Sequence, residues 1–185
     1  MQTIICLLRG INVSGHRPLK MAALKDMLTT MGFAEIQTYV QSGNVIFKSK
    51  LADLKELEQS IATQLEKTFG YTDIPVSCFN AEEWENILAE NPFDKDPEKD
   101  SKFFHITFLN GVAEEKGKAA LEAKKREGEE LLCGDSVMYL YLPKGYGTSK
   151  LTNTFIESKL NVTATTRNWK TCNKLLEISL QPAKK

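Results

Sequence analysis

The sequence lacks an excess of either charge. Among its 185 residues, 24 are Lys or Arg and 24 are Asp or Glu, so the formal net charge is zero. A protein that binds nucleic acid chiefly by neutralising phosphates usually carries a basic excess. The balance therefore argues against that kind of binding, although a local basic patch is compatible with a neutral total.

Metal-ligating motifs are also missing. The four cysteines lie far apart in the sequence and form no CxxC pair: Cys6, Cys78, Cys133 and Cys172. With only two histidines, the chain offers too few closely spaced ligands for a zinc site. We expect no bound metal, we identify no cofactor, and we expect the cysteines to be small buried side chains in a reducing compartment.

Long hydrophobic runs are absent too. No apolar run is long enough to cross a membrane, and the N-terminus lacks the charged segment that begins a secretory signal. The hydrophobic content of 42% and the charged content of 26% are ordinary for a globular protein with a core. A cytoplasmic protein of one large or two small domains is therefore expected.

Familiar catalytic constellations are not found either. The sequence suggests no paired carboxylates, no Ser-His-Asp set and no Cys-His pair in a persuasive position. Residues 148–150 resemble part of a phosphate loop, but the GxxxxGK[ST] spacing is missing. Whether the protein is an enzyme stays open; for an enzyme, transfer or hydrolysis on a phosphorylated substrate fits best.

What the sequence does contain begins with a short apolar run, residues 4–8, which predicts a buried strand. A loop rich in Gly, Asn and Arg follows at residues 9–18, before an amphipathic helix begins near Met21. Gly lets the backbone approach a ligand closely, and Arg supplies a planar fork for carboxylate or phosphate. A loop between a strand and a helix also offers free amides to an anion. This loop is therefore a candidate binding loop.

Hydrophobic periodicity predicts the order β-α-β-β-α-β and then one more helix in residues 1–90. Gly32 and Gly70 are natural helix stops, and Asn80 with Glu83 is typical of a capping box at the start of the last helix. The expected strands are 4–8, 36–40, 45–47 and 74–79, and the second helix is expected at 51–69. This order is that of the split βαβ, or ferredoxin-like, fold.

Residues 103–185 repeat this order. Strands are expected at 103–109, 131–133, 137–142 and 162–165, and helices at 113–125, 151–160 and 168–178. The polar, proline-containing segment 91–102 is predicted to be a linker. We therefore predict an α+β fold made by tandem duplication of a ferredoxin-like βαββαβ unit, with copies at 1–90 and 103–185, each followed by an extra helix.

The topology of such a unit predicts where unusual residues gather. In the first copy, the end of the first strand lies beside the turn between the second and third strands, which brings Arg9–Asn12 next to Gln41–Asn44. In the second copy, Pro143–Lys150 and Thr165–Trp169 follow or end strands at the opposite edge, and both precede helices. If the copies oppose these edges about a pseudo-twofold axis, loops of both copies line one cleft.

Twelve residues are the expected ligand contacts: Arg9, Gly10, Asn12, Ser42, Gly43, Asn44, Lys150, Asn153, Thr166, Arg167, Asn168 and Trp169. Arg9 and Arg167 would hold an anionic group, Asn side chains would donate hydrogen bonds, and Lys150 would help to neutralise the charge. The competing interpretation is structural: the glycines only form turns, Ser149, Thr152 and Asn168 only cap helices, and Trp169 only packs.

Four segments carrying these residues also resemble a known family, the bacterial domain of unknown function 1697 family. They are Leu7–Val13 (LLRGINV), Tyr39–Phe47 (YVQSGNVIF), Ser149–Asn153 (SKLTN) and Thr165–Trp169 (TTRNW). The resemblance spans nearly the whole chain, and the spacing of four motifs makes it specific. It implies an α+β fold and a cytoplasmic bacterial protein, and it implies no particular reaction or ligand.

The leading functional hypothesis is a protein that binds an anionic small molecule or nucleotide. An alternative is a single-stranded nucleic-acid-binding module, because ferredoxin-like sheets can present aromatic rings to bases; the strands nevertheless lack a clustered aromatic and basic pattern. A second alternative is an interaction or scaffold protein without catalysis, which would need an exposed apolar patch. No membrane partner is expected, and the oligomeric state stays open.

Overall fold

The protein is a mixed α and β chain with two four-stranded antiparallel sheets, and six α-helices lie in the part that the structure describes. The computed structural model describes residues 1–13 and 15–181; Ser14 and residues 182–185, the end of the predicted second copy, lie outside it. Internal contacts divide the chain into two compact units. The first unit is Met1–Asn86 with the chain from Lys174 onward, and the second unit is Ile87–Asn173.

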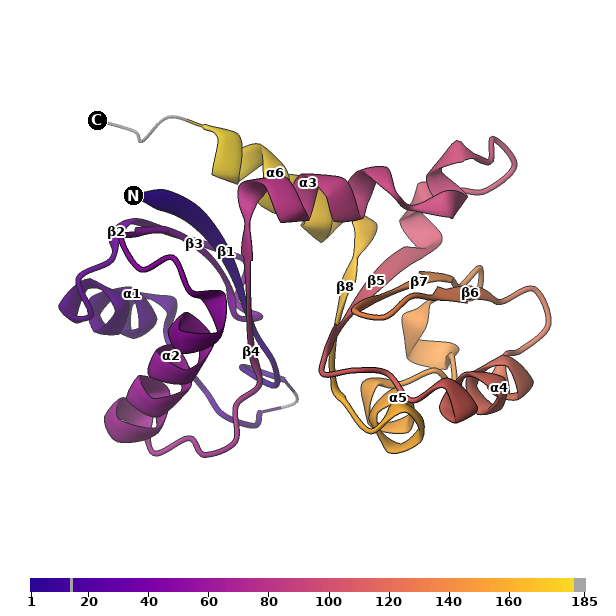
Figure 1. Cartoon of the computed structure of the whole chain (residues 1–185), viewed down its shortest axis with the longest axis horizontal. Helices are drawn as coiled ribbons and strands as arrows, with labels where there is room; N and C mark the ends of the chain where they lie inside the picture. Colours follow the sequence, from indigo (N-terminus) through magenta and orange to yellow (C-terminus); the bar gives the residue numbers. More distant parts are fainter. Residues whose placement is uncertain (14, 182–185) are drawn as a thin grey trace. The chain divides into compact units, whose positions relative to one another are not determined.

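The first unit contains a sheet of order β2-β3-β1-β4, in which neighbouring strands are antiparallel. Helices α1 and α2 cover one face of this sheet (Figure 1), and Leu24, Leu57 and Ile61 pack there with buried strand residues. The elements in chain order are β1 (Gln2–Leu8), α1 (Met21–Thr30), β2 (Ala34–Tyr39), β3 (Asn44–Ser49), α2 (Leu54–Phe69) and β4 (Val76–Asn80).

The second unit contains a sheet of order β6-β7-β5-β8, again antiparallel throughout. Helices α4 and α5 lie on one face of it (Figure 1), where Leu121, Ile156 and Leu160 form a core with strand residues. The elements in chain order are β5 (Phe104–Asn110), α4 (Glu115–Lys124), β6 (Glu130–Cys133), β7 (Val137–Tyr141), α5 (Asn153–Leu160) and β8 (Thr163–Asn168).

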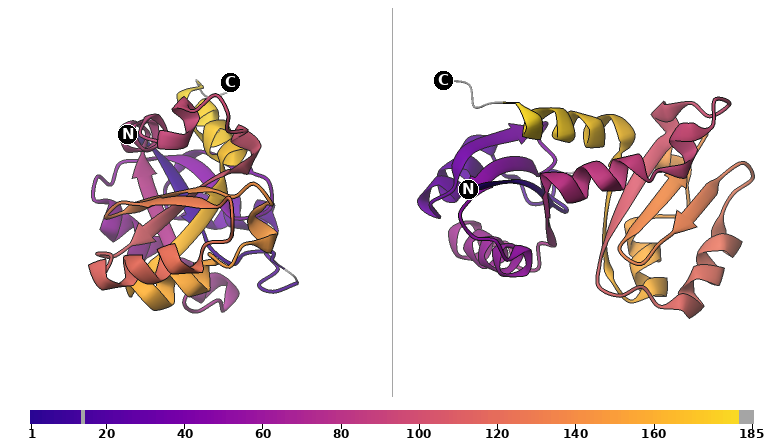
Figure 2. Two further views of the ribbon diagram at one scale, coloured as in Figure 1. Left: turned by 90° about the vertical axis from the view of Figure 1, so that its right-hand side faces the viewer. Right: turned by 45° about the horizontal axis from the view of Figure 1, so that its top comes forward.

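Each fourth strand continues directly into a helix: β4 into α3 (Ala81–Ala89) and β8 into α6 (Trp169–Leu180) (Figure 2). Side chains set these starts. The Glu83 backbone N–H donates to Asn80 Oδ1 at 2.8 Å, and the Asn80 backbone N–H donates to Glu83 Oε2 at 3.0 Å, which is the predicted capping box. The order of elements predicted from periodicity is thus confirmed, including both trailing helices.

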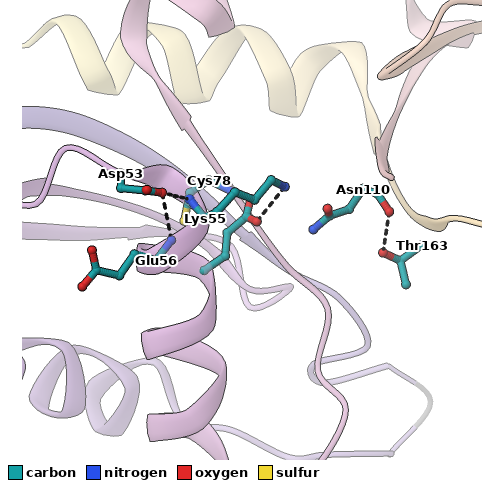
Figure 3. A network of polar contacts seen from close by, with 7 residues as sticks. Asp53, Lys55, Glu56, Cys78, Asn110 and Thr163 are labelled. Atoms are coloured by element: carbon teal, nitrogen blue, oxygen red, sulfur yellow. Dashed lines mark hydrogen bonds and ion pairs between the residues drawn. The ribbon is translucent and has the colours of Figure 1, made fainter. Parts of the chain in front are cut away.

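Helix starts were predicted too early where apolar residues precede the cap. Helix α2 begins at Leu54 and not at Leu51, because Asp53 accepts hydrogen bonds from the Lys55 and Glu56 backbone N–H groups (Figure 3). Its other end is fixed by Gly70, whose φ of 71° is the left-handed conformation common at helix ends. Helix α5 likewise begins after its cap residue, Thr152.

Segment 91–102 has regular structure of its own. It contains two 3-10 helices, η1 (Pro92–Lys95) and η2 (Ser101–Phe103). Phe93 is buried, with its ring centroid 6.2 Å from those of Phe104 and Tyr141. Lys99 bridges Asp96 and Glu130 and also lies over the Tyr141 ring. The segment therefore packs as part of the second unit.

No helix within residues 1–13 and 15–181 combines the length and apolarity needed to cross a membrane. Three of the four cysteines are buried, as expected for small core side chains: Cys6, Cys78 and Cys172. Cys133 is half-buried.

Candidate functional site

At one end of the first sheet, the two predicted loops meet. The Leu8 backbone N–H donates to Gly43 O at 2.7 Å, and Asn12 Nδ2 donates to Gln41 O at 2.8 Å. The loop after β1 therefore lies beside the turn between β2 and β3, as the topology predicts. The ligand-binding role of these loops stays a prediction.

The Asn12 side chain is used to build this loop. Its Nδ2 also donates to Leu19 O at 2.8 Å, and its Oδ1 accepts from the Leu19 backbone N–H at 2.7 Å. Asn12 itself has a positive φ of 55°, a conformation that Asn tolerates better than most residues. Both amide donors and the amide oxygen are thus engaged within the chain, and Asn12 ties the two ends of the loop to the neighbouring turn.

Gly43 and Asn44 are likewise required by the turn. Gly43 has a φ of +75°, and a Cβ added there would lie 2.7 Å from Leu8 O, so only glycine fits without displacing backbone. Asn44 is fully buried, and its Nδ2 donates to Tyr39 O and to Ser42 Oγ. These positions hold the turn against β1.

The second half of this loop, around Arg17 and Pro18, is hydrogen-bonded to the segment before β4. Arg17 Nη2 donates to Thr72 O at 2.9 Å, and Tyr71 Oη donates to Pro18 O at 2.7 Å. The backbone N–H of the half-buried Arg9 donates to Pro75 O at 3.0 Å. Gly10, with a φ of +73°, lies next to the Arg17 guanidinium. The described part of the loop between β1 and α1 is therefore hydrogen-bonded to the segment before β4 at several points.

In the second unit, six polar or aromatic residues gather where β5 begins and β8 ends. We call them the strand-end cluster: His105, Thr107, Tyr146, Asn153, Thr166 and Asn168. His105 faces Asn168 across the β5–β8 pair, and Thr107 faces Thr166. Because alternate residues of a strand point to the same face, these four share one face of the sheet. Tyr146 comes from the chain between β7 and α5, and Asn153 is the first residue of α5.

A chain of hydrogen bonds orients Asn153. The hydroxyls of Thr107 and Thr166 lie 2.8 Å apart, and Thr166 Oγ1 donates to Asn153 Oδ1 at 2.6 Å. Thr107 is fully buried, whereas Asn153 is half-buried. With its oxygen occupied, the Asn153 amide can only donate elsewhere, and its Nδ2 makes no hydrogen bond to any residue that the structure describes.

Burial favours the neutral form of His105. Its ring is half-buried and stacks on Tyr146, with centroids 5.3 Å apart. Burial lowers the pKa of His105 below its usual 6.5, and the contact with Phe103 O opposes this only in part. Nδ1 lies 3.2 Å from Phe103 O, and because a carbonyl only accepts, Nδ1 carries the proton. Nε2 is therefore the acceptor nitrogen of the ring.

Arg167 and Trp169 make contacts outside the strand-end cluster, and the amide oxygen of Asn168 is used by α6. Arg167 lies between Thr166 and Asn168 on β8, so its side chain leaves from the opposite face, and Arg167 Nη1 donates to Thr166 O at 3.0 Å. Trp169 makes an edge contact with the Phe104 ring at 6.1 Å. Asn168 Oδ1 accepts from the Thr171 backbone N–H at 2.8 Å and so caps α6. Lys150 is exposed.

The predicted site residues thus form two groups within separate units. Arg9, Gly10 and Asn12 lie with Ser42–Asn44, whereas Asn153, Thr166 and Asn168 share the strand-end cluster. Sequence reasoning missed His105, Thr107 and Tyr146. The alternation of His105 and Thr107 in an otherwise apolar strand was the available signal, since both must face one side. No group of three or more potential metal ligands occurs among the residues described.

The fold is that of an α+β protein with two four-stranded antiparallel sheets. The chain belongs to the family described as protein of unknown function (DUF1697), whose model matches residues 1–139. This confirms the family that the motifs suggested, although Ser149–Asn153 and Thr165–Trp169 lie outside the matched range.

A solved structure of similar fold is that of the conserved bacterial protein SP0830 from Streptococcus pneumoniae. The two chains are 22% identical, with a TM-score of 0.72, and the match covers 96% of this chain and 98% of that chain. At this identity the likeness shows the fold alone. A comparison with curated proteins finds no match.

Proposed function

We propose that the protein binds an anionic small molecule or nucleotide through the strand-end cluster and the adjoining Lys150. The observation that carries this proposal is the 2.6 Å hydrogen bond from Thr166 to Asn153, which joins two of the four motifs. This bond engages the oxygen of the Asn153 amide and orients the group, so that its two N–H donors are the part that a ligand can contact. Donors that are already oriented before binding lose little entropy when an anion arrives.

A positively charged residue lies close to Asn153 in the sequence. Lys150 is exposed three residues before Asn153, and α5 begins at Asn153 with its backbone N–H groups directed toward the N-terminal end. The positive end of a helix dipole and the backbone amides of a helix start favour a phosphate or carboxylate, and here one of these amides, the Phe155 N–H, already donates to Thr152 Oγ1. The neutral His105 adds a hydrogen-bond acceptor, Nε2, which suits a hydroxyl of the same ligand.

In the first unit, the asparagines and the arginine have different roles in this proposal. Asn12 and Asn44 use their amides within the chain, so we propose that they hold the loop while Arg9 provides the charge. Arg167 leaves β8 from the face opposite the strand-end cluster, so we propose that any charge it provides acts on that other face. That the loops of both units line one cleft stays a prediction.

We also propose that the chain is a tandem duplication of a ferredoxin-like βαββαβ unit. Support comes from the matching strand orders, β2-β3-β1-β4 and β6-β7-β5-β8, and from a fourth strand that runs directly into a helix in both cases. A superposition of the two units that failed to align their four strands in this order would contradict the duplication.

The packing of the second sheet favours a small ligand over single-stranded nucleic acid. Its face opposite α4 and α5 carries Phe104 and Tyr141, the kind of rings on which bases stack. Phe93 packs against both rings, and Phe104 is only 1% exposed. Bases would have to displace segment 91–102 to reach them.

The test is a thermal-shift and calorimetric titration of the whole chain with inorganic phosphate, AMP, glucose 6-phosphate and a short oligonucleotide. We expect Asn153→Asp to weaken the affinity for a phosphorylated probe at least about tenfold, because a repelling carboxylate replaces oriented donors. Lys150→Ala should weaken it less. Lys95→Ala, which removes an exposed lysine elsewhere in the second unit, is the matched control.

If the wild type, Asn153→Asp and Lys150→Ala bind the phosphorylated probe with equal affinity, the strand-end cluster is not the binding site. Arg9→Ala and Arg167→Ala complete the set. A ligand that stabilises the wild type and neither arginine variant supports roles for both guanidiniums, whereas unchanged shifts exclude both. Binding of the oligonucleotide alone, with a steep salt dependence, would favour the nucleic-acid alternative.

A further inference from the structure

Cys6 and Cys78 face each other across the first sheet. They are partners in the antiparallel β1–β4 register, and both are buried, with exposed fractions of 1% and 4%. Both belong to the core between the sheet and its helices, so their side chains point to the same face. Neither Cys133, which is opposite Met138, nor Cys172 on α6 has a cysteine as strand partner.

Hydrogen bonding shows which kind of strand pair they form. β4 is an edge strand, and the Cys78 backbone N–H donates outward to Glu58 Oε1 on α2, at 2.9 Å, instead of to β1. On β1, the Leu8 N–H points to the β3 side, toward Gly43 O, and Cys6, two residues earlier, has the same orientation. Both observations make Cys6 and Cys78 a non-hydrogen-bonded pair.

That type of pair brings side chains closest. Opposed residues in a non-hydrogen-bonded antiparallel pair have Cα atoms about 4.5 Å apart, against about 5.5 Å in the hydrogen-bonded type. The Cα separation of disulfides ranges from about 4.4 to 6.8 Å. The neighbouring Cys6 thiol also raises the pKa of Cys78, as expected for two thiols that lie close together. A bond between the sulfurs therefore requires little backbone movement.

We propose that Cys6 and Cys78 form a thiol–disulfide site, which closes to a cross-strand disulfide by exchange with a low-molecular-weight disulfide such as oxidised glutathione. In the first step one cysteine thiolate attacks the small disulfide, its S–S bond breaks, and one small thiol leaves. In the second step the other cysteine attacks the mixed disulfide and releases the second small thiol. The two cysteines lose two electrons and two protons, and the small disulfide gains them.

The surroundings of the pair set its reactivity. The pKa of Cys78 lies above its ordinary value, first because of the hydrogen bond with Cys6 and then because of burial; the nearby Glu58 carboxylate raises it further, and Lys55 opposes the rise. Since the thiolate is the attacking species, exchange is slow at neutral pH and accelerates as the pH rises. Figure 3 shows Cys78 and Lys55 near the start of α2.

Closure would tie the edge strand to the centre of the sheet. β4 is joined to the first loop through the hydrogen bond from Arg9 N–H to Pro75 O, just before the strand begins. A covalent link at Cys6 and Cys78 therefore restrains the strand that borders this loop. Amide hydrogen exchange in 76–80 should slow when the disulfide is present.

The experiment equilibrates the whole chain in glutathione buffers of graded composition, quenches with acid, and maps disulfides by peptide mass spectrometry. Equilibrium, reached from both the reduced and the oxidised side, removes the effect of slow access to buried sulfurs. We expect one intramolecular disulfide, between Cys6 and Cys78, with an effective concentration above about 1 M. Its formation should be faster at pH 9 than at pH 7.

Two variants support the map. A chain with Cys133→Ala and Cys172→Ala should retain the full disulfide, and Cys6→Ala should lose it and leave at most a mixed disulfide. If a variant folds poorly, the disulfide map of the wild-type protein still tests the proposal. Mixed disulfides with glutathione alone, a pairing that involves Cys133 or Cys172, or two free thiols in the most oxidising buffer would each overturn the proposal. None of these results depends on the proposed ligand.

Discussion

The two units use asparagine in opposite ways at their motif-bearing ends. In the first unit, Asn12 engages both its donors and its oxygen within the chain, and Asn44 is fully buried. In the second unit, Asn153 gives only its oxygen to Thr166 and remains half-buried. The same residue type therefore stabilises a loop in one unit and presents donors in the other.

The cause lies in what surrounds each side chain. The loop after β1 is long and has few apolar residues, so its backbone groups need side-chain partners to replace water. In the second unit, β8 and α5 already satisfy most backbone groups, and the Asn153 side chain is needed for a single bond. A motif residue in a long loop is therefore first a candidate for holding that loop together.

The largest expected effect concerns Gly43. We expect Gly43→Ala to lower the free energy of unfolding by about 3 kcal/mol, because a Cβ would both adopt an unfavourable positive φ and clash with Leu8 O. The matched control is Gly32→Ala, which has a φ of +84° but no atom nearby, and should cost about 1 kcal/mol. Urea denaturation measures both; equal losses would mean that the close approach to β1 is unimportant.

Alanine substitutions at Asn12 and Asn153 test the different roles of asparagine in the two units. Asn12→Ala should cost about 2 kcal/mol, because it removes three hydrogen bonds, and Asn153→Ala about 1 kcal/mol, because it removes one. The same denaturation curves provide the values. A larger loss at Asn153 than at Asn12 would reverse the roles assigned to the two units.

The paired helix caps give a smaller difference. Asn80 and Asn168 each accept from a backbone N–H three residues ahead, but only Asn80 has a reciprocal partner, Glu83. Asn80→Ala should therefore cost about 1.5 kcal/mol and Asn168→Ala about 1 kcal/mol. Thermal unfolding can compare them. If Glu83→Ala leaves stability unchanged, the reciprocal bond contributes nothing and the difference should vanish.

The smallest expected effect is a pH dependence at His105. Because burial lowers the pKa of folded His105 below 6.5, the unfolded chain binds a proton first as the pH falls. This contribution to stability is present above pH 6.5 and is lost as the pH drops below it. Denaturation at pH 7.5 and pH 5.5 should show a smaller loss in His105→Asn than in the wild type. An identical loss in both would assign the pH dependence to other groups.

Periodicity predicted the order of the elements because apolar spacing directly reflects which side of a strand or helix is buried. It placed the α2 start at Leu51 because that residue is apolar, whereas the cap, Asp53, lies two residues later. Segment 91–102 was predicted to be a linker because its composition is polar. Phe93 and Lys99 tie this segment to Tyr141, and that contact depends on a residue far away in the sequence.

For the candidate site, topology correctly predicted that the loop after β1 meets the turn between β2 and β3 in the first unit, since strand order fixes which ends are adjacent. It did not separate the faces of β8, so Arg167 was grouped with Thr166 and Asn168 although neighbouring residues of a strand point apart. It also gave no role to His105 and Tyr146, because their stacking joins the start of β5 to a loop after β7.

The sequence by itself determined the order of strands and helices, several of their ends and the family, because capping residues, glycine stops and apolar spacing act over a few neighbouring residues. Only the tertiary structure decided which asparagine amides are engaged, that His105 lies against Tyr146, and that Cys6 faces Cys78. Those outcomes depend on the register between strands, and register is set by packing contacts between residues far apart along the chain.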